Sequence, residues 1–351
     1  MTTASVPGQY QSPWDPSTEA PLPSGTQIDG NFPVPTAGMV LHRVLAGAAR
    51  TFLLNDMDTP EEDTDPVVAV DARSVMGTPP AWAQSAATAL DNAQRRTSET
   101  ERVHQSRVAL RRIRSNLRTF RLALHPAWGT SLRAELAWYG GQLGAARDLH
   151  ILGQLIAAHG PDAMGADQVA DLQSVVAARM ASAVADIAAA RGGARRFQLT
   201  EQMMVLWDGP AFKAKADRPA PEVLPVMLHR AWHDLRVAAR AARKDATEAN
   251  LHKVRIRVKD LRYGCETVAL IEGGPARKTA RAAERLQTKL GDLHDAYFSI
   301  AWLEDLAGDR RDLSDPIDQL IAVQRDSVAA TRRGWKGELK EVERRWRRWQ
   351  G

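Results

Sequence analysis

The sequence is poor in cysteine, because Cys265 is the only one among 351 residues. An intrachain disulfide is therefore impossible, and a zinc site built from several thiolates is excluded. A single cysteine suits the reducing cytoplasm, where thiols stay reduced. No apolar run approaches 18 residues, and the first residues carry no charged and then apolar leader. We therefore expect a cytoplasmic protein without a membrane span.

Recognisable catalytic motifs are missing as well. The chain has no GxSxG nucleophile elbow, no GxxxxGK[ST] phosphate loop and no HExxH helix. The arginine-rich surroundings of the histidines would repel a metal cation. The sequence therefore predicts a protein that is not an enzyme and that has neither a metal site nor another cofactor.

What the sequence has in abundance is helical periodicity. Most of the chain after residue 38 repeats apolar residues every 3.6 positions, and convincing pairs of alternating strands are missing. This pattern predicts an all-α protein. Helices are expected near residues 38–54, 80–96, 100–124, 130–158, 164–191, 195–206, 222–243, 246–271, 275–307 and 313–348.

Proline marks the expected boundaries of the helical domain. Residues 1–36 carry seven of the 19 prolines and no Lys or Arg, so we predict a disordered tail there. Four prolines mark residues 207–225 as a linker. The helical domain is then expected over residues 37–348, with a first repeat at about 37–206 and a second at about 226–348.

Three short segments recur in the same order and indicate an internal duplication. The segment at His104 resembles that at His252, and Leu143-Gly144 with Asp148 resembles Leu290-Gly291 with Asp295; the two spacings are 148 and 147 residues. Leu41-His42-Arg43 resembles Leu228-His229-Arg230 at a spacing of 187 residues. The longer spacing places an insertion in the first half, where six acids lie between Asp56 and Asp65.

Two of the expected helices carry a basic stripe beside an apolar face. From Glu101 to His125 there are seven arginines and one acid, although like charges one turn apart destabilise a helix by roughly 0.2–0.5 kcal/mol per pair. A bound polyanion would relieve this repulsion, and the planar guanidinium suits phosphate oxygens. The predicted polyanion site comprises His104, Arg107, Arg111, Arg112, Arg114 and Arg118, then His252, Arg255, Lys259 and Arg262, and from a third stripe Arg281, Arg285 and Lys289.

The stripes also belong to a longer motif. His104-x-x-Arg107-Val108-x-x-Arg111-Arg112-x-Arg114, followed by Leu143-Gly144-x-x-Arg147-Asp148, resembles the signature of the CHAD family, the histidine-bearing α-helical domains. A second copy begins at His252, with Asp260 and His294 in place of two arginines. The resemblance covers about residues 38–348. It implies two pseudo-symmetric helical bundles around a basic pore that binds inorganic polyphosphate, and association with polyphosphate granules.

Two other functions stay open at this point. Basic helices also bind nucleic acid, although the stripes lack the Asn, Gln or aromatic residues that read bases. A regulatory adaptor of polyphosphate-metabolising enzymes is the second alternative. Outside the stripes, Arg147-Asp148 and His294-Asp295 are expected to hold helices together. The tryptophans of the arginine-rich C-terminus are expected to pack back onto the core.

Overall fold

The computed structural model describes residues 34–56 and 99–350. The helix expected at 80–96 and nearly all of the tail expected at 1–36 lie outside these residues, as does the acidic run after Asp56. In the described ranges the prediction of an all-α protein is confirmed, because they contain helices and only two isolated β-bridges. The helices belong to one compact unit that spans residues 35–351.

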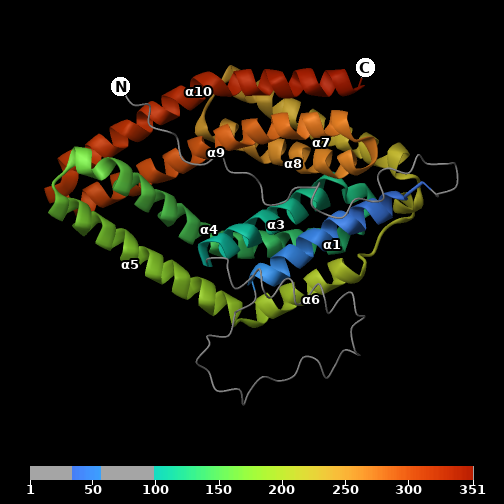
Figure 1. The fold of residues 1–351 in the computed structure, drawn as a ribbon, viewed down its shortest axis with the longest axis horizontal. Coiled ribbons are helices and arrows are strands. Elements are labelled where there is room, and N and C mark those ends of the chain that lie inside the picture. The colour runs from blue at the N-terminus through green and yellow to red at the C-terminus, as the bar shows by residue number, and fades with distance from the viewer. Residues whose placement is uncertain (1–33, 57–98, 351) are drawn as a thin grey trace, which may run out of the picture. The chain divides into compact units, whose positions relative to one another are not determined.

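Each helix expected within the described ranges is present, and its ends differ by a few residues from those expected from the periodicity. The bounds are α1 Ala37–Asp56, α3 Glu99–Thr119, α4 Pro126–Ala163, α5 Ala166–Arg191, α6 Ala194–Asp208, α7 Ala220–Lys244, α8 Glu248–Glu272, α9 Gly274–Asp309 and α10 Ser314–Gln350 (Figure 1). Three short 3₁₀ turns, η3 Arg121–Ala123, η4 Ala214–Asp217 and η5 Arg311–Leu313, join some of them.

The irregular segment in the middle of the chain is shorter than the linker expected over residues 207–225. It runs only from residue 209 to 219, because α6 ends at Asp208 and α7 begins at Ala220. Pro221 lies at the start of α7 and Pro225 within it. Proline is tolerated in a first helical turn, whose N–H groups have no partner within the helix. Clustered prolines therefore marked the beginning of a helix as well as the end of a loop.

Three hydrophobic clusters hold the helices together. The first is built from α1, α3, α4 and α6, and the second mainly from α7, α8, α9 and α10. A third joins the ends of α4 and α5 to those of α9 and α10. The two copies of the motif fall on α3–α4 and α8–α9, and α3 also contacts α8 directly. The duplication and the pore themselves stay predictions.

The tryptophans near the C-terminus pack inward, as the sequence suggested. Trp335 and Trp346 of α10 are buried, and Trp346 stacks on Trp232 of α7 with ring centroids 4.9 Å apart. The indole N–H of Trp349 donates a hydrogen bond of 2.6 Å to Glu272 at the end of α8. The aromatic residues of this arginine-rich helix are therefore part of the core and its edge.

Two of the described helices, α1 and α5, are long and apolar enough to cross a membrane by length and composition alone. In α1, however, Leu41, Leu45 and Phe52 lie in the hydrophobic core. In α5, Leu172 and Val176 pack into the third cluster. Core helices commonly pass such a test, so this finding is weak evidence for a membrane span.

Gly264 marks the closest approach of α8 to its neighbours. A Cβ atom at this position would lie 2.5 Å from Cδ1 of Leu228 on α7 and 3.1 Å from Cγ2 of Thr119 on α3. We predict that Gly264→Ala lowers the free energy of unfolding by about 1–3 kcal/mol through overpacking. Urea unfolding measures it against Gly337→Ala on α10, where nothing lies within 4 Å and a gain of about 1 kcal/mol is expected. Equal effects of the two substitutions would contradict the close approach.

Candidate anion-binding site

The apolar faces of α3 and α8 fix the positions of their basic stripes. Leu110, Ile113 and Leu117 of α3 are buried, as are Val254 and Val258 of α8. The basic positions adjoin these apolar faces on each helix. When the apolar face is buried, the cations therefore lie at the edge of the core. The stripes are accordingly half-buried rather than fully solvated, apart from the exposed His252.

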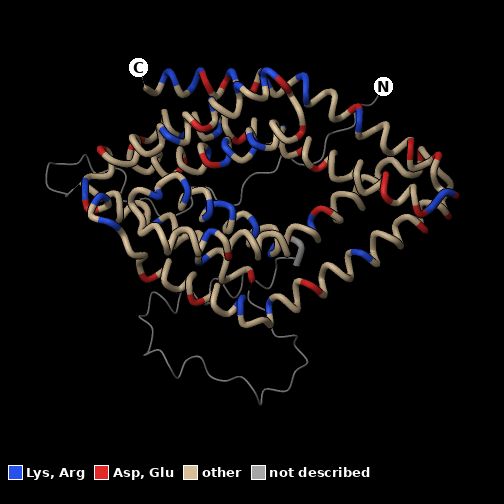
Figure 2. Tube along the Cα trace, turned by 180° about the vertical axis from the view of Figure 1, so that it is seen from behind, with Lys and Arg blue, Asp and Glu red and all other residues tan. Residues whose placement is uncertain are grey.

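The cations of the two helices come close enough to disturb one another. Burial lowers the pKa of Lys259 well below its usual value, and Arg255 of the same helix and Arg111, Arg107 and Arg114 of α3 lower it further. Burial and Arg111 also lower the pKa of Arg107, to about 10. We call Arg107, Arg111, Arg114, Arg255 and Lys259 the central basic cluster. Figure 2 shows Lys and Arg positions of both helices in this region.

Two arginines of the central basic cluster have buried nitrogen atoms that find no partner in the described part of the chain. Nε and Nη1 of Arg107 and Nε of Arg255 have no hydrogen-bond partner among the described residues. Most buried polar groups in proteins are hydrogen-bonded, and an unpaired buried donor costs free energy. Arg107 and Arg255 hold matching places in the two copies of the motif. Their nitrogens are the donors that a bound anion would satisfy.

The Leu-Gly pair on α4 makes room for the guanidinium group of Arg107. A Cβ atom at Gly144 of α4 would lie only 3.0 Å from Nη1 of Arg107, whereas one at Gly291 of α9 would lie 3.9 Å from Nη2 of Arg255, an ordinary van der Waals contact. Gly144 therefore leaves space beside Arg107 that a larger residue would restrict. At Gly291 the arginine side chain lies nearby without needing a glycine.

Arg147 connects the two copies of the motif beside the central basic cluster. Its Nη2 lies 3.2 Å from Oδ2 of Asp295 on α9, and its Nη1 lies 3.8 Å from Oδ1 of Asp148 on its own helix. This ion pair links α4 to α9, which is the structural role expected for the Arg147-Asp148 and His294-Asp295 pairs. Asp148 and Asp295 also act on the cluster, because Asp148 raises the pKa of Arg107 and Asp295 raises that of Arg255, in opposition to burial.

Three histidines lie at the edge of the central basic cluster. The rings of His252 and His294 have centroids 5.4 Å apart, so the replacement of an arginine by His294 places a second imidazole in the site. Burial followed by Arg255 lowers the pKa of both histidines, that of His294 to about 4. Burial followed by Arg111 lowers the pKa of His104. Sequence analysis included His104 and His252 in the site but did not include His294.

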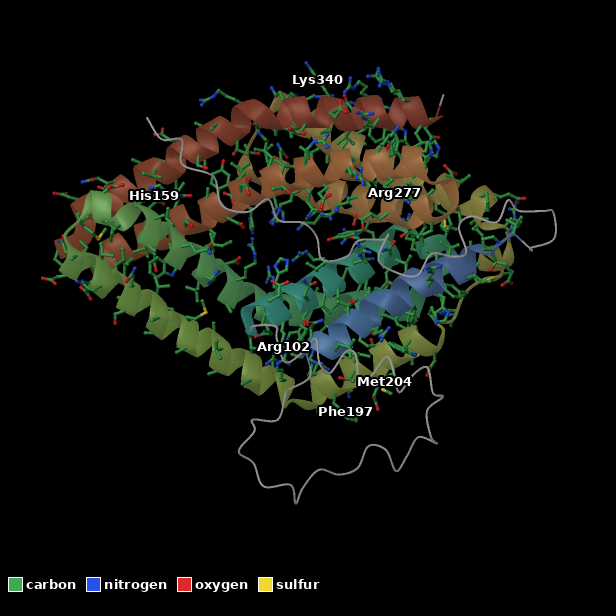
Figure 3. The ribbon with its side chains drawn as sticks, viewed as in Figure 1. Arg102, His159, Phe197, Met204, Arg277 and Lys340 are labelled. Atoms are coloured by element: carbon green, nitrogen blue, oxygen red, sulfur yellow. The ribbon has the colours of Figure 1, made fainter. Side chains whose placement is uncertain are left out.

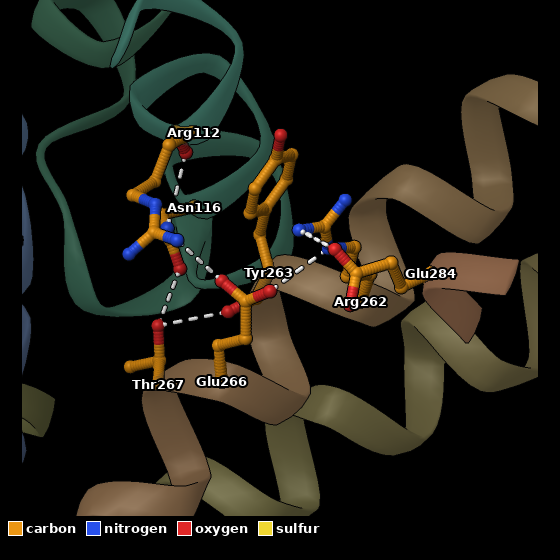
Figure 4. A network of polar contacts seen from close by, with 7 residues as sticks. All are labelled: Arg112, Asn116, Arg262, Tyr263, Glu266, Thr267 and Glu284. Carbon is orange, nitrogen blue, oxygen red and sulfur yellow. Dashed lines mark hydrogen bonds and ion pairs between the residues drawn. The ribbon is translucent and has the colours of Figure 1, made fainter. Parts of the chain in front are cut away.

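Arg112 and Arg262 form a network of internal ion pairs, and their contact with an anion stays a prediction. Nη2 of Arg112 lies 2.6 Å from Glu266, whose other oxygen lies 2.9 Å from Nε of Arg262, while Nη2 of Arg262 lies 2.6 Å from Glu284 (Figure 4). Both guanidinium groups are about nine-tenths buried. These ion pairs satisfy the two arginines and fasten α3 to α8 and α9.

Arg118 also has an internal counter-ion. Its Nη1 lies 2.9 Å from Oδ2 of Asp260, whose side chain is only 3% exposed. Asp260 replaces an arginine in the second copy of the motif, and its carboxylate pairs with an arginine of the first copy. Arg133 of α4 lies near Arg118. Burial lowers the pKa of Arg133, and Arg118 lowers it further. The buried Nε of Arg133 has no hydrogen-bond partner among the described residues. No sequence signal marks Arg133, because it lies outside the motif.

The third basic stripe lies against α10 instead of extending the central basic cluster. Arg281 and Arg285 are exposed on α9, and Nε of Arg285 lies 3.4 Å from Glu338 of α10. A Cβ atom at Gly334 of α10 would lie 2.7 Å from Nζ of Lys289. The prediction that these three residues bind the polyanion stays a prediction, but their stripe lies apart from the central basic cluster.

A pocket of about 500 Å³ lies elsewhere, at the junction of α5 and α6. Its lining includes Asp56, whose buried carboxylate pairs with Nη2 of Arg196 at 2.6 Å and accepts a hydrogen bond of 2.7 Å from Tyr139. These contacts bind α1 to α4 and α6. Within the described ranges, no three His, Cys, Asp or Glu side chains are grouped to hold a metal ion. His229 and His233 are one turn apart, but His229 packs on Trp346.

Over residues 34–56 and 99–350, these observations define a helical protein in which two basic helices bring together cations with unsatisfied buried nitrogens. A family model described as the CHAD domain matches residues 82–304, more than half of the chain, and the chain therefore belongs to the CHAD family. This finding confirms the resemblance seen in the motif.

Two solved structures are similar to this chain in fold. PptA from Streptomyces chartreusis is 19% identical with a TM-score of 0.64, and the match covers 87% of this chain and 99% of that one. The CHAD domain from the plant Ricinus communis is 19% identical with a TM-score of 0.59, and the match covers 88% and 92%. No protein with a curated description matches the chain.

Two arginines of α3 should respond in opposite ways to the same substitution. We predict that Arg112→Gln lowers the free energy of unfolding by about 1–3 kcal/mol, because it removes a hydrogen-bonded partner of buried Glu266. Arg107→Gln should leave stability unchanged or raise it by about 0.5 kcal/mol, because it relieves repulsion. Thermal unfolding at low salt without added anions measures the stability of both variants. A larger loss of stability for Arg107→Gln than for Arg112→Gln would refute the assignment of different roles to the two arginines.

Proposed function

We propose that this chain binds inorganic polyphosphate through the central basic cluster. The observation that carries the proposal is the set of buried nitrogens of Arg107 and Arg255 without a hydrogen-bond partner among the described residues. Phosphate oxygens accept from guanidinium groups and carry the charge that the cluster lacks. Membership of the CHAD family agrees with this proposal.

A linear anion fits the cluster better than a single phosphate ion. The cations come from α3 and α8, and Lys259 is influenced by arginines of both helices. Cations held close together with few carboxylates repel one another, and each added phosphate unit of a bound chain offsets part of that repulsion. Orthophosphate reaches only one or two donors at once. A chain of phosphates can contact donors from both helices.

The same chemistry supports binding rather than catalysis. Arg147 already pairs with Asp295, and Glu266 and Asp260 pair with arginines, so these carboxylates are engaged in ion pairs. We propose that the chain holds polyphosphate without cleaving it, in the cytoplasm and in association with polyphosphate granules. Regulation of polyphosphate-metabolising enzymes would use the same site.

The first functional prediction concerns the two arginines with unpaired nitrogens. Arg107→Gln with Arg255→Gln should weaken binding of short polyphosphate at least tenfold, because charged hydrogen bonds to phosphate contribute roughly 1.5–3 kcal/mol each. Log affinity of the unsubstituted protein should fall with log salt concentration, and orthophosphate should bind far more weakly. Calorimetric titration measures the affinities, and the polyphosphate recovered afterwards should keep its length.

Matched controls separate the site from total charge. Lys213→Gln with Lys215→Gln removes two exposed positive charges next to η4 and should leave the affinity within twofold. Circular dichroism checks that each variant keeps its helices. Equal losses in both variants would contradict the proposal. Equal affinity for RNA and polyphosphate at one salt concentration would favour the nucleic-acid alternative instead.

The histidines predict a pH dependence whose sign follows from their surroundings. Burial and Arg255 lower the pKa of His252 and His294 in the free protein, with His294 at about 4, and Lys259 acts in the same direction. Only Glu248 and Asp295 oppose this shift. A bound phosphate chain would raise the pKa of both rings. Binding would then take up protons, so affinity should increase as pH falls below about 6.5.

Titrations at pH 7.5 and 5.5, at equal ionic strength, test this dependence. The affinity should rise about threefold to tenfold at the lower pH. In a protein with His252→Asn and His294→Asn the rise should be at most half as large on a logarithmic scale. The end groups of polyphosphate change protonation between the two pH values in the same way with either protein, so their contribution cancels when the two proteins are compared. An undiminished rise in the doubly substituted protein would exclude these histidines as its source.

A further inference from the structure

The outer face of α10 carries a second row of cations. The row consists of Arg333, Lys336, Lys340, Arg344 and Arg347, which we call the α10 ridge. At 100° per residue these positions fall within about 80° of the helix surface, and at 1.5 Å per residue they extend over about 21 Å. All five are exposed. In Figure 3 the side chain of Lys340 points away from the other helices.

No acidic residue lies within the sector of the α10 ridge. The three nearest acids stand at its sides, and two of them bind arginines of other helices: Glu338 pairs with Arg285 of α9 at 3.4 Å and Glu343 with Arg243 of α7 at 2.8 Å. Glu341 pairs with the flanking Arg345 at 2.7 Å and with one member of the ridge, Arg344. Lys336 and Lys340, one turn apart, have no ion pair with a described residue. The ridge therefore repeats on a solvated surface the concentration of like charge found in the stripes.

The chemistry of the α10 ridge favours an occupant that is charged along its whole length. The tryptophans of this helix do not lie on the ridge, because Trp335 and Trp346 are buried and Trp349 is bonded to Glu272. Among the described residues, the only exposed large hydrophobic residue of α10 is Val323, which precedes the ridge. Aromatic side chains would be needed to stack bases, and apolar ones to enter a bilayer.

The α10 ridge is separate from the central basic cluster. Trp335, Leu339 and Trp346 of α10 face the core, so the ridge lies on the opposite side of the helix. The cluster lies between α3 and α8, whereas α10 packs mainly against α9 and reaches the end of α8 at Glu272 (Figure 1). Two phosphate chains, or two distant stretches of one long chain, could therefore be held at the same time.

We propose that the α10 ridge is a second surface for inorganic polyphosphate, through which one molecule connects two polyphosphate chains. This inference rests on the proposed function of the central basic cluster. Two binding surfaces on one molecule raise the effective concentration at the second surface after the first has bound. Long chains with many bound molecules would then be joined into clusters. The ridge supplies the connection and the central basic cluster supplies the tighter attachment.

A charge-matched pair of variants tests the α10 ridge. The ridge variant carries Arg333→Gln, Lys336→Gln, Lys340→Gln and Arg347→Gln. The control variant removes four exposed positive charges from other regions, with Arg179→Gln, Lys213→Gln, Lys215→Gln and Arg311→Gln. Light scattering with long-chain polyphosphate measures clustering, and calorimetry with short-chain polyphosphate measures binding at the tighter site. Circular dichroism confirms that each variant is folded.

In the ridge variant, short-chain affinity at the tighter site should stay within twofold, while the polyphosphate concentration at which clusters form should rise at least tenfold. The control variant should cluster like the unsubstituted protein. Unchanged clustering in the ridge variant, or equal losses in both variants, would overturn the inference. If the ridge variant equally reduced clustering by single-stranded RNA or binding to anionic vesicles, the assignment to polyphosphate would be wrong.

The outcome can be told apart from failure of the proposed function. Arg107→Gln with Arg255→Gln tests the central basic cluster on short chains alone, as described above. In that background, residual binding of long chains should be reduced at least fivefold further by the four ridge substitutions. A further reduction in long-chain binding supports polyphosphate binding by the α10 ridge, even if the central basic cluster prefers another ligand. If the ridge substitutions cause no further reduction, the proposal for the ridge is wrong, but that for the central basic cluster is unaffected.

Discussion

Repulsion between the cations of α3 and α8 is the constraint on which the rest of the structure depends. Arg107, Arg111, Arg255 and Lys259 are partly buried and near one another, which makes this region costly in the absence of an anion. Buried apolar faces hold the helices in place despite this cost. The Arg112–Glu266–Arg262 network adds a polar connection that lies directly beside the repelling charges. This network of ion pairs thus stabilises the fold, whereas the central basic cluster destabilises it.

This arrangement separates the arginines of one motif into two roles. Arg112, Arg118 and Arg262 have carboxylate partners from another helix and fasten the bundle. Arg107 and Arg255 lie near Asp148 and Asp295, which raise their pKa, but their buried nitrogens have no hydrogen-bond partner among the described residues and keep capacity for a ligand. An arginine is therefore suited to an anion where its donors are left without a hydrogen-bonded carboxylate. On the α10 ridge, Lys336 and Lys340 likewise have no ion pair with a described residue, whereas Arg344 pairs with Glu341.

Much of the fold followed from periodicity. The apolar repeat predicted α7, α8 and α9 to within a few residues, since burial of one helical face requires that spacing. The predicted linker was too long because Pro221 and Pro225 lie in α7: Pro221 occupies the first turn, where proline is compatible with the helix, and Pro225 lies inside the helix. Arg133 went unnoticed because one basic residue on α4 has no periodic signal that distinguishes it from a solvated one.

The sequence by itself determined that two basic helices exist, that each places cations beside an apolar face, and that the chain resembles the CHAD family. These properties depend on spacing along one helix. Tertiary structure alone decided which cations have counter-ions, because Glu266 and Asp260 meet arginines of α3 across more than 100 residues and Glu284 meets Arg262 from the next helix. It also decided that Arg281 and Arg285 lie outside the central basic cluster and that α10 presents a ridge of its own. Coulomb interactions depend on distance in space, which the order of residues does not specify.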